Sequence, residues 1–185
     1  MKSCRASRGL SNQGAVRDET EPVRARVAHL ALRYGSPALD VGTGACACMA
    51  VSMARLGLRV DAVDYSSSAV RIAQERATGK LADSLEVHYA DGARLPFPDG
   101  FYRVVTAFDA LCHAPNPTSV LVEMFRVCTH GGVVIIVELN ADGRLITRHR
   151  DVGFEESLPG LLGRHCRTCR QLDYPHHAVY VCEKP

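Results

Sequence analysis

The sequence lacks any hydrophobic run long enough to cross a lipid bilayer. Its longest mainly apolar stretch, residues 132–139, is far shorter than the roughly 20 residues that a transmembrane helix needs. The N-terminal segment M-K-S-C-R-A-S-R-G-L also has no apolar core of the kind that secretory signals contain. We therefore expect a cytoplasmic protein without a membrane partner.

An excess of charge of either sign is missing as well. The chain has 22 basic and 20 acidic residues, which gives a formal net charge of +2. Proteins that bind nucleic acids or anionic membranes tightly usually carry a marked positive charge. The composition therefore gives no strong signal for a nucleic-acid partner.

The length and composition are typical of a single globular domain. The chain has 185 residues, of which 46% are hydrophobic and 23% are charged, and such proportions exclude a disordered or collagen-like protein. Residues 1–19 show no apolar periodicity, so we expect them to form a flexible N-terminal arm. Residues 20–185 are then expected to form one domain.

From residue 20 onward, short buried strands alternate with amphipathic helices. Helices are expected after Thr20, over residues 45–56 and 66–77, after Asn116, and around Leu158. Strands are expected over residues 38–41, 58–63, 85–89, 102–108, 133–138, 165–173 and 177–182. Because Pro159 and Gly160 interrupt the last helical segment, that helix should be short or begin at the proline.

The expected strands are nearly continuous hydrophobic runs. Such runs are typical of a parallel sheet that is covered by helices on both faces. The last two strands lie too close together in the sequence for a crossover helix, so we expect them to pair antiparallel. The sheet should then be parallel except for one reversed strand at its edge.

A glycine-rich turn, Gly42-Thr43-Gly44, follows the first expected strand. Glycine permits positive φ angles and lets a ligand approach the backbone closely, and ligands of open α/β sheets bind at this end of the strands. As G-x-G-x-x-A, which ends at Ala47, the turn resembles the dinucleotide-binding fingerprint. As D-x-G-x-G, which begins at Asp40, it resembles the nucleoside-binding loop of S-adenosylmethionine (SAM) enzymes.

Acidic residues at three successive strand ends favour the SAM interpretation. Asp40 precedes the glycines, where a carboxylate would repel a pyrophosphate but attract the amino group of SAM. Asp64 ends the second strand, where an acid can accept hydrogen bonds from both ribose hydroxyls. Asp91 follows the third strand, where a carboxylate can bind the adenine amine. The alternative is that these three acids only cap turns.

Residues 38–139 resemble the class I SAM-dependent methyltransferases, especially the small-molecule branch known as type 11. The matching segments are A-L-D-V-G-T-G-A-C, V-D-A-V-D-Y-S-S-S-A-V, A-D-G-A-R-L-P-F-P-D-G-F, F-D-A-L-C-H-A-P-N-P and E-M-F-R-V-C-T-H-G-G-V-V-I-I-V-E. The resemblance implies an α/β fold, a three-layer Rossmann-like sandwich whose mostly parallel seven-stranded sheet has an antiparallel last strand. It also implies an enzyme that transfers a methyl group from SAM to a small-molecule acceptor and releases S-adenosylhomocysteine.

The resemblance assigns residues to the cofactor and to the reaction. The cofactor residues are Asp40, Gly42, Thr43 and Gly44 at the methionine end, Asp64 and Tyr65 at the ribose, Asp91 and Gly92 at the adenine, and Phe108 at the sulfonium. Asp109 would face the acceptor, and His113 is the candidate general base because the ordinary pKa of histidine suits proton transfer near neutral pH. An ordinary loop histidine is the alternative, because many methyl transfers need no base.

Two of the departures from the family pattern bear on the function. The family usually has a third glycine where this chain has Cys46, whose side chain would crowd the methionine tail of the cofactor. The segment over residues 140–163, where relatives often insert a substrate cap, is short, so a homodimer could complete the acceptor site. These departures motivate one alternative, a SAM-binding regulatory module without turnover, and a nicotinamide-dependent reductase is another.

The eight cysteines are expected to be free thiols that pack as small hydrophobic side chains. The candidate metal ligands near the C-terminus are Cys166, Cys169, His176, His177 and Cys182. A C-x-x-C pair can bind zinc when it forms a turn, but residues i and i+3 of a strand point to opposite faces. Because we expect a strand over residues 165–173, we expect no metal site. Cys46 and Cys48 should begin a helix, where thiols are normally acidic and reactive.

Overall fold

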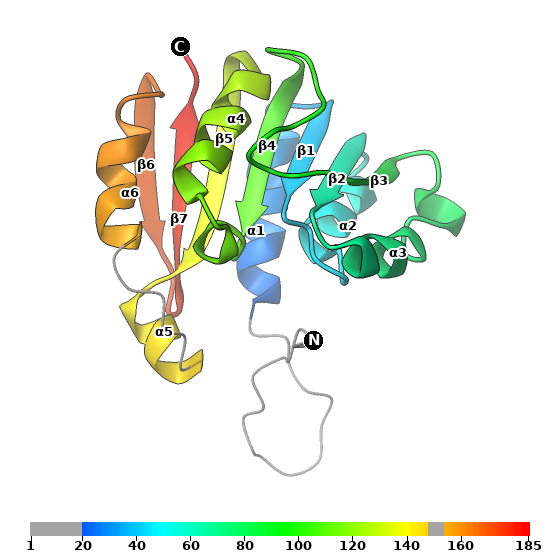
Figure 1. The fold of residues 1–185 in the computed structure, drawn as a ribbon, viewed down its shortest axis with the longest axis horizontal. Coiled ribbons are helices and arrows are strands. Elements are labelled where there is room, and N and C mark those ends of the chain that lie inside the picture. Colours follow the sequence, from blue (N-terminus) through cyan, green and yellow to red (C-terminus); the bar gives the residue numbers. More distant parts are fainter. Residues whose placement is uncertain (1–19, 148–153) are drawn as a thin grey trace.

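The computed structural model describes residues 20–147 and 154–185, which form a seven-stranded sheet between two layers of helices (Figure 1). The expected flexible arm, residues 1–19, lies outside the described residues. Within the described residues, no helix is both long enough and apolar enough to span a membrane.

The sheet has the order β3-β2-β1-β4-β5-β7-β6. Its strands are β1 (Ala38–Val41), β2 (Val60–Asp64), β3 (Leu85–Tyr89), β4 (Tyr102–Phe108), β5 (Cys128–Leu139), β6 (Thr168–Asp173) and β7 (His177–Glu183). Strands β1 to β5 pair in parallel, whereas β7 is antiparallel to both β5 and β6. The predicted Rossmann-like fold with an antiparallel last strand is therefore confirmed.

The expected position of the reversed strand was wrong. We expected it at the edge of the sheet, but β7 lies between β5 and β6, and β6 occupies the edge. The side chains of β7 are buried from His177 to Cys182, whereas those of β6 are exposed except for the half-buried Leu172. The more hydrophobic strand occupies the interior because that position buries more apolar surface.

Helices cover both faces of the sheet. They are α1 (Glu21–Leu32), α2 (Cys48–Arg55), α3 (Ser67–Gln74), α4 (Pro117–Val127), α5 (Ala141–Thr147) and α6 (Phe154–Leu162). Helices α1, α2 and α3 pack on one face, and α4 and α6 pack on the other. Along β5, Ile135 faces the first layer and Ile136 faces the second, so this strand is buried on both sides.

Three helices differ from the expectation. Helix α2 begins at Cys48 rather than near residue 45, because Ala47 adopts a left-handed conformation with φ of 44°. Helix α5 was not foreseen. Helix α6 is short, as expected, but it continues through Pro159 instead of beginning there. Both Leu158 and Leu162 are fully buried in the core, and this burial offsets the hydrogen bond that the proline cannot make.

Candidate active site

The carboxyl ends of the parallel strands meet at one edge of the sheet, which is the lower edge in Figure 1. The strand register aligns Val41 with Val63, Asp64 with Tyr89, and Phe108 with Val137. The turns that follow β1, β2, β3 and β4 are therefore neighbours, and all the predicted cofactor residues lie on or beside these strand ends.

The glycine turn after β1 is held tightly and is open on one side. The main-chain N–H groups of Gly42 and Thr43 donate to the Val63 carbonyl at 2.9 and 3.0 Å. Gly42 has φ of 74°, and a Cβ atom there would lie 2.6 Å from the Cβ of Ala110. Gly44 has φ of 63°, but a Cβ atom there would meet no atom within 4 Å. The turn thus offers open space beside Gly44, where a ligand can approach the backbone.

Asp40 is buried beneath this turn. Its two carboxylate oxygens accept hydrogen bonds from the hydroxyls of Thr43 and Thr106, each at 2.7 Å. Burial raises the pKa of Asp40 to about 6, although these hydrogen bonds oppose the shift. The carboxylate therefore links the glycine turn to β4 through hydrogen bonds. Its predicted attraction for the amino group of the cofactor would act from beneath the turn.

Asp64 connects the glycine turn to the start of α3. Its buried carboxylate accepts hydrogen bonds from the N–H of Gly44 at 2.8 Å and from the N–H of Ser66 at 2.9 Å. A carboxylate has about four acceptor positions, so Asp64 keeps capacity for further donors such as two hydroxyls. The neighbouring Tyr65 side chain is 62% exposed.

The turn after β3 packs against the same region. A Cβ atom on Gly92 would lie 3.1 Å from Val41 and 3.2 Å from Val120, so this turn sits close to the end of β1 and to α4. Asp91 is exposed, and its Oδ1 accepts a hydrogen bond from the N–H of Ala93 at 2.9 Å. The carboxylate is therefore oriented by its own turn and faces solvent.

A histidine that sequence reasoning did not assign to this site lies beside Asp109. The Nε2 atom of His177 is 3.2 Å from Oδ2 of Asp109, and the His177 ring lies 5.6 Å from the half-buried ring of Phe108. Asp109 itself has φ of 48°, a conformation that is strained for most residues and is frequent at functional sites. Its other oxygen, Oδ1, is buried and has no hydrogen-bond partner among the described residues.

Glu138, near the end of β5, is a second buried residue that sequence reasoning missed. Its side chain is 1% exposed, and its Oε1 accepts a hydrogen bond from the N–H of Leu111 at 2.9 Å. Burial, helped by the nearby negative charge of Asp109, raises the pKa of Glu138 to about 7. The only sequence signal was an acid within an otherwise apolar strand.

His113 ends the short helical turn η2 (Leu111–His113), and its side chain is exposed. This residue follows β4 as the sequence predicted. The hydrogen bond of Asp109, however, is made to His177. The role of His113 as a base stays a prediction.

The two cysteines at the start of α2 differ from the expectation. Their thiols hydrogen-bond to each other, and this bond together with burial raises the pKa of Cys48. We expected reactive thiols here because of the helix N-terminus, so for Cys48 that expectation was wrong. Ala47, which has φ of 44°, lies between the two cysteines.

The strand expected over residues 165–173, which was the reason to expect no metal site near the C-terminus, is shorter in the structure. Strand β6 begins only at Thr168, so Cys166 precedes it and is free of the strand's alternation. The sulfur atoms of Cys166, Cys169 and Cys182 all lie within 4.8 Å of one another. Hydrogen bonding from Cys182, and more weakly from Cys166, lowers the pKa of Cys169 to about 7.

Comparison with known proteins identifies the family. Residues 39–136 match the family model of the methyltransferase domain, type 11. Because this match spans more than half of the chain, the protein belongs to this family of methyltransferases.

Several curated relatives are methyltransferases of quinone biosynthesis. The chain is 35% identical over 113 residues to a ubiquinone biosynthesis O-methyltransferase of Albidiferax ferrireducens, a match that covers 60% of this chain and 44% of that protein. It is 29% identical over 137 residues to a ubiquinone/menaquinone biosynthesis C-methyltransferase of Cupriavidus metallidurans, covering 73% of this chain and 56% of the relative. The chain thus spans about half the length of the curated relatives it matches.

Solved structures agree with the fold. The PH0226 protein of Pyrococcus horikoshii superimposes with a TM-score of 0.72 at 16% identity, over 91% of this chain and 92% of that one. The [4+2]-cyclase SpnF superimposes with a TM-score of 0.68 at 18% identity, over 87% of this chain and 81% of the other. Since proteins of this fold carry different activities, the activity has to be argued from the site.

Proposed function

We propose that the protein binds SAM at the carboxyl edge of the sheet and transfers its methyl group to a small-molecule acceptor. The observation that carries the proposal is the hydrogen bond between the Gly44 N–H and the Asp64 carboxylate at 2.8 Å. This bond brings the spare acceptor capacity of Asp64 next to the open space beside Gly44, so one ligand can touch both. Membership of the methyltransferase family supports SAM as that ligand.

The residues at this edge fit the parts of SAM in order. Asp64 would accept hydrogen bonds from the ribose hydroxyls, with the exposed Tyr65 beside it, and the exposed Asp91 would accept one from the adenine amine. Gly92 packs closely against Val41 and Val120, so its turn lies close to the sheet and to α4. This position would leave room for the adenine. The main chain of the glycine turn would hold the methionine end, with Asp40 supplying negative charge beneath it.

Asp109 is the residue best suited to face the reacting groups. A buried carboxylate oxygen without a partner costs roughly 1–3 kcal/mol, and a ligand that brings a positive charge or a hydrogen-bond donor removes that cost. When bound, SAM supplies a methyl group that is already activated by its sulfonium, so the protein mainly has to align the acceptor and exclude water. We assign the acceptor's hydroxyl or amine to the carboxylate of Asp109, whose side chain is 30% exposed.

His177 is assigned as a positioning residue for Asp109. A buried histidine that pairs with a carboxylate fixes its orientation and can share a proton with it. This arrangement provides a route for the acceptor's proton that does not need His113, so the two histidines have distinguishable roles. The absence of N-P-P-Y or D-P-P-Y after β4 argues against the amino group of adenine or glutamine as the acceptor, and it leaves oxygen, sulfur, carbon and other nitrogen acceptors open.

The proposal is tested by binding and turnover together. Isothermal titration of SAM and S-adenosylhomocysteine into folded protein should show one site, and NADPH should not compete for it. Product detection by mass spectrometry should then find methylated product in a panel that starts with quinols and other phenols, because a curated relative is named as a ubiquinone biosynthesis O-methyltransferase. Binding without product across the panel would favour a SAM-binding module, and no binding of either nucleoside would overturn the proposal.

A further inference from the structure

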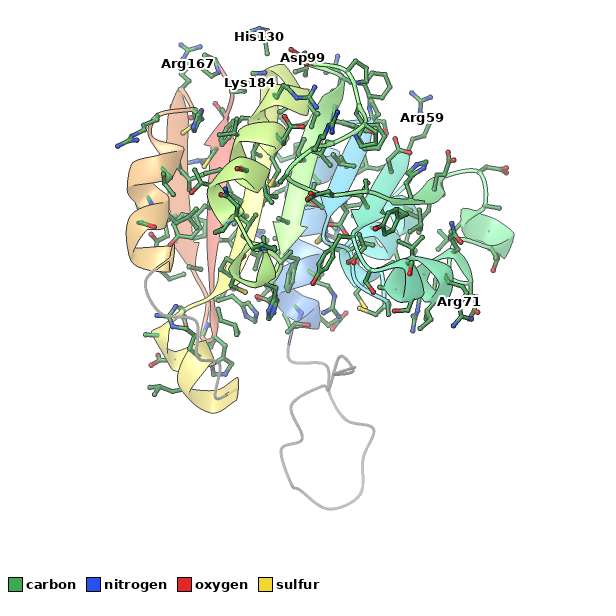
Figure 2. All side chains as sticks on the ribbon, in the orientation of Figure 1. Arg59, Arg71, Asp99, His130, Arg167 and Lys184 are labelled. Carbon is green, nitrogen blue, oxygen red and sulfur yellow. The ribbon has the colours of Figure 1, made fainter. Side chains whose placement is uncertain are left out.

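A cluster of three cysteines lies at the other end of the sheet from the candidate active site. Cys166 precedes β6, Cys169 lies within β6, and Cys182 lies in β7. Figure 2 shows Arg167 and Lys184, which neighbour these cysteines in sequence, at the upper end of the sheet, whereas the parallel strands end at the lower edge. The cluster is therefore separate from the proposed SAM site.

The fold itself brings the three thiols together. Cys169 and Cys182 are directly opposite each other in the antiparallel register of β6 and β7, so their side chains project from the same face of the sheet. Cys166 lies in the turn after α6, where its thiol donates a hydrogen bond to the Leu162 carbonyl at 3.0 Å. The turn after α6, β6 and β7 thus contribute one sulfur each, so the cluster depends on the tertiary fold.

The spacing suits a tetrahedral metal ion. A zinc ion binds thiolates at about 2.3 Å, so the sulfurs of such a site lie roughly 3.8 Å apart. The three sulfurs here are all within 4.8 Å of one another, and shifts of about 1 Å or less would close the site. Thiolate ligands select soft or borderline ions such as zinc over magnesium or calcium.

We propose that Cys166, Cys169 and Cys182 bind one zinc ion, with a water molecule as the fourth ligand. The solvent-exposed position of Cys169 gives water access to the fourth position, and it also keeps the negative charge of three thiolates and one zinc ion hydrated. The other cysteines with described positions, such as the Cys46 and Cys48 pair, lack a third ligand of this kind within the described residues.

The expected role of the ion is structural. Strand β6 is at the edge of the sheet and its side chains are mostly exposed, so little apolar burial holds it in place. A metal ion bound by β6, by β7 and by the turn after α6 would connect this edge strand to the buried β7. Zinc should therefore stabilise the fold and leave the affinity for SAM unchanged.

The test uses the full chain, reduced with a phosphine and stripped of metal by a chelator. Titration with Co²⁺ alone should produce thiolate-to-cobalt absorption that saturates at one ion per chain, and Zn²⁺ should displace the cobalt stoichiometrically. Cys166→Ser and Cys169→Ser should each weaken binding by roughly 100-fold or more, since each removes one of three protein ligands. Cys46→Ser with Cys48→Ser is the matched control and should bind cobalt like the parent.

Other results would overturn the proposal. One is no thiolate-to-cobalt absorption from folded, reduced protein, with folding checked by circular dichroism. Another is equal loss of binding in the Cys46 and Cys48 control. A third is a Cys169–Cys182 disulfide that mass spectrometry still detects after reduction. Because Cys166 lies outside both strands, its variant should fold even if the strand variants do not. SAM titration of the metal-free protein separates failure of this proposal from failure of the proposed function.

Discussion

The carboxylate of Asp64 and the main-chain N–H of Gly44 are hydrogen-bonded at 2.8 Å across 20 positions of sequence. This bond joins the end of β2 to the turn after β1, and a second one to Ser66 joins both to the start of α3. A single side chain thus orders the backbone of the proposed cofactor site and also faces the proposed ribose. Different substitutions of Asp64 can separate its role in ordering the backbone from its proposed role in binding the ribose.

Asp64→Asn should weaken SAM binding while largely preserving the fold. The amide keeps one oxygen for the Gly44 or Ser66 N–H but loses the charge that strengthens bonds to the ribose hydroxyls. We expect a loss of about 2–3 kcal/mol in binding, or roughly a hundredfold in Kd by isothermal titration. Asp64→Ala should in addition lower the free energy of unfolding by roughly 1–3 kcal/mol, because two N–H groups lose their partner. An Asn variant that binds SAM like the parent would show that the ribose lies elsewhere.

The two glycines of the turn should respond differently to alanine. Gly42→Ala adds a Cβ atom 2.6 Å from that of Ala110, so we expect it to lower the free energy of unfolding by more than roughly 2 kcal/mol. Gly44→Ala meets no protein atom and should cost about 1 kcal/mol from its positive φ alone, yet it should weaken SAM binding.

Gly57→Ala is the control for this pair. Gly57 has φ of 90° and open space around it, but it lies at the far end of α2. Denaturant unfolding and SAM titration of the three variants should give a stability loss without a binding loss for Gly57→Ala. If Gly44→Ala leaves SAM affinity as unaffected as Gly57→Ala does, the methionine end of SAM does not lie beside Gly44.

His177→Asn should lower turnover more than it lowers cofactor affinity. The variant disturbs the partner of Asp109 and not the glycine turn, so we expect kcat to fall by about 10- to 100-fold while the Kd for SAM changes little. Its pH–rate profile should also change shape, which a merely structural defect would not cause. His113→Ala is the comparison: if it reduces kcat and His177→Asn does not, the base is His113 and the pairing with Asp109 is incidental.

The fold should lose stability as the pH rises through the range from about 4.5 to 7, in part because of Glu138. Burial raises the pKa of Glu138 to about 7 from its ordinary value of 4.5, so in this range the native state binds a proton that the unfolded chain has released. Raising the pH therefore disfavours the native state, by at most roughly 3 kcal/mol once the pH exceeds 7.

Glu138→Gln isolates this contribution. The amide oxygen can still accept the hydrogen bond from Leu111, but the side chain no longer titrates. Asp40, whose pKa burial raises to about 6, acts in the same direction and remains in both proteins. Denaturant unfolding at pH 5 and at pH 8 should show a smaller loss for the variant than for the parent, and an equal loss would contradict the assignment.

The parts of the fold that depend on local sequence were predictable. All seven strands were predicted, most of them from short hydrophobic runs, and Asn116 capped α4 as expected, with its side chain accepting from the Ser119 N–H. Helix α5 and the interior position of β7 were missed, because both depend on which segments pack together after the strands have formed. The left-handed conformation of Ala47 was not predictable, because glycine and not alanine is the residue that usually indicates a positive φ angle.

The residues of the candidate site also fall into those that local sequence predicts and those that it does not. The acids and glycines at the strand ends were found because they follow the strands directly. The pairing of Asp109 with His177 spans 68 positions, and the cysteine cluster joins a turn to two strands, so no local pattern marks either one. The start of β6 was predicted three residues too early, at residue 165 instead of Thr168, and the observed start leaves Cys166 outside the strand.

A crystal structure of the protein with S-adenosylhomocysteine would test the central claim most directly. We expect the ribose hydroxyls within hydrogen-bond distance of Asp64, the adenine beside Asp91 and Gly92, and the sulfur on the side of Phe108 and Asp109. The Asp109 carboxylate should then line the space into which the methyl group of SAM would point. A nucleoside bound away from the carboxyl ends of β1 and β2, or one whose ribose leaves Asp64 bonded only to Gly44 and Ser66, would contradict the account.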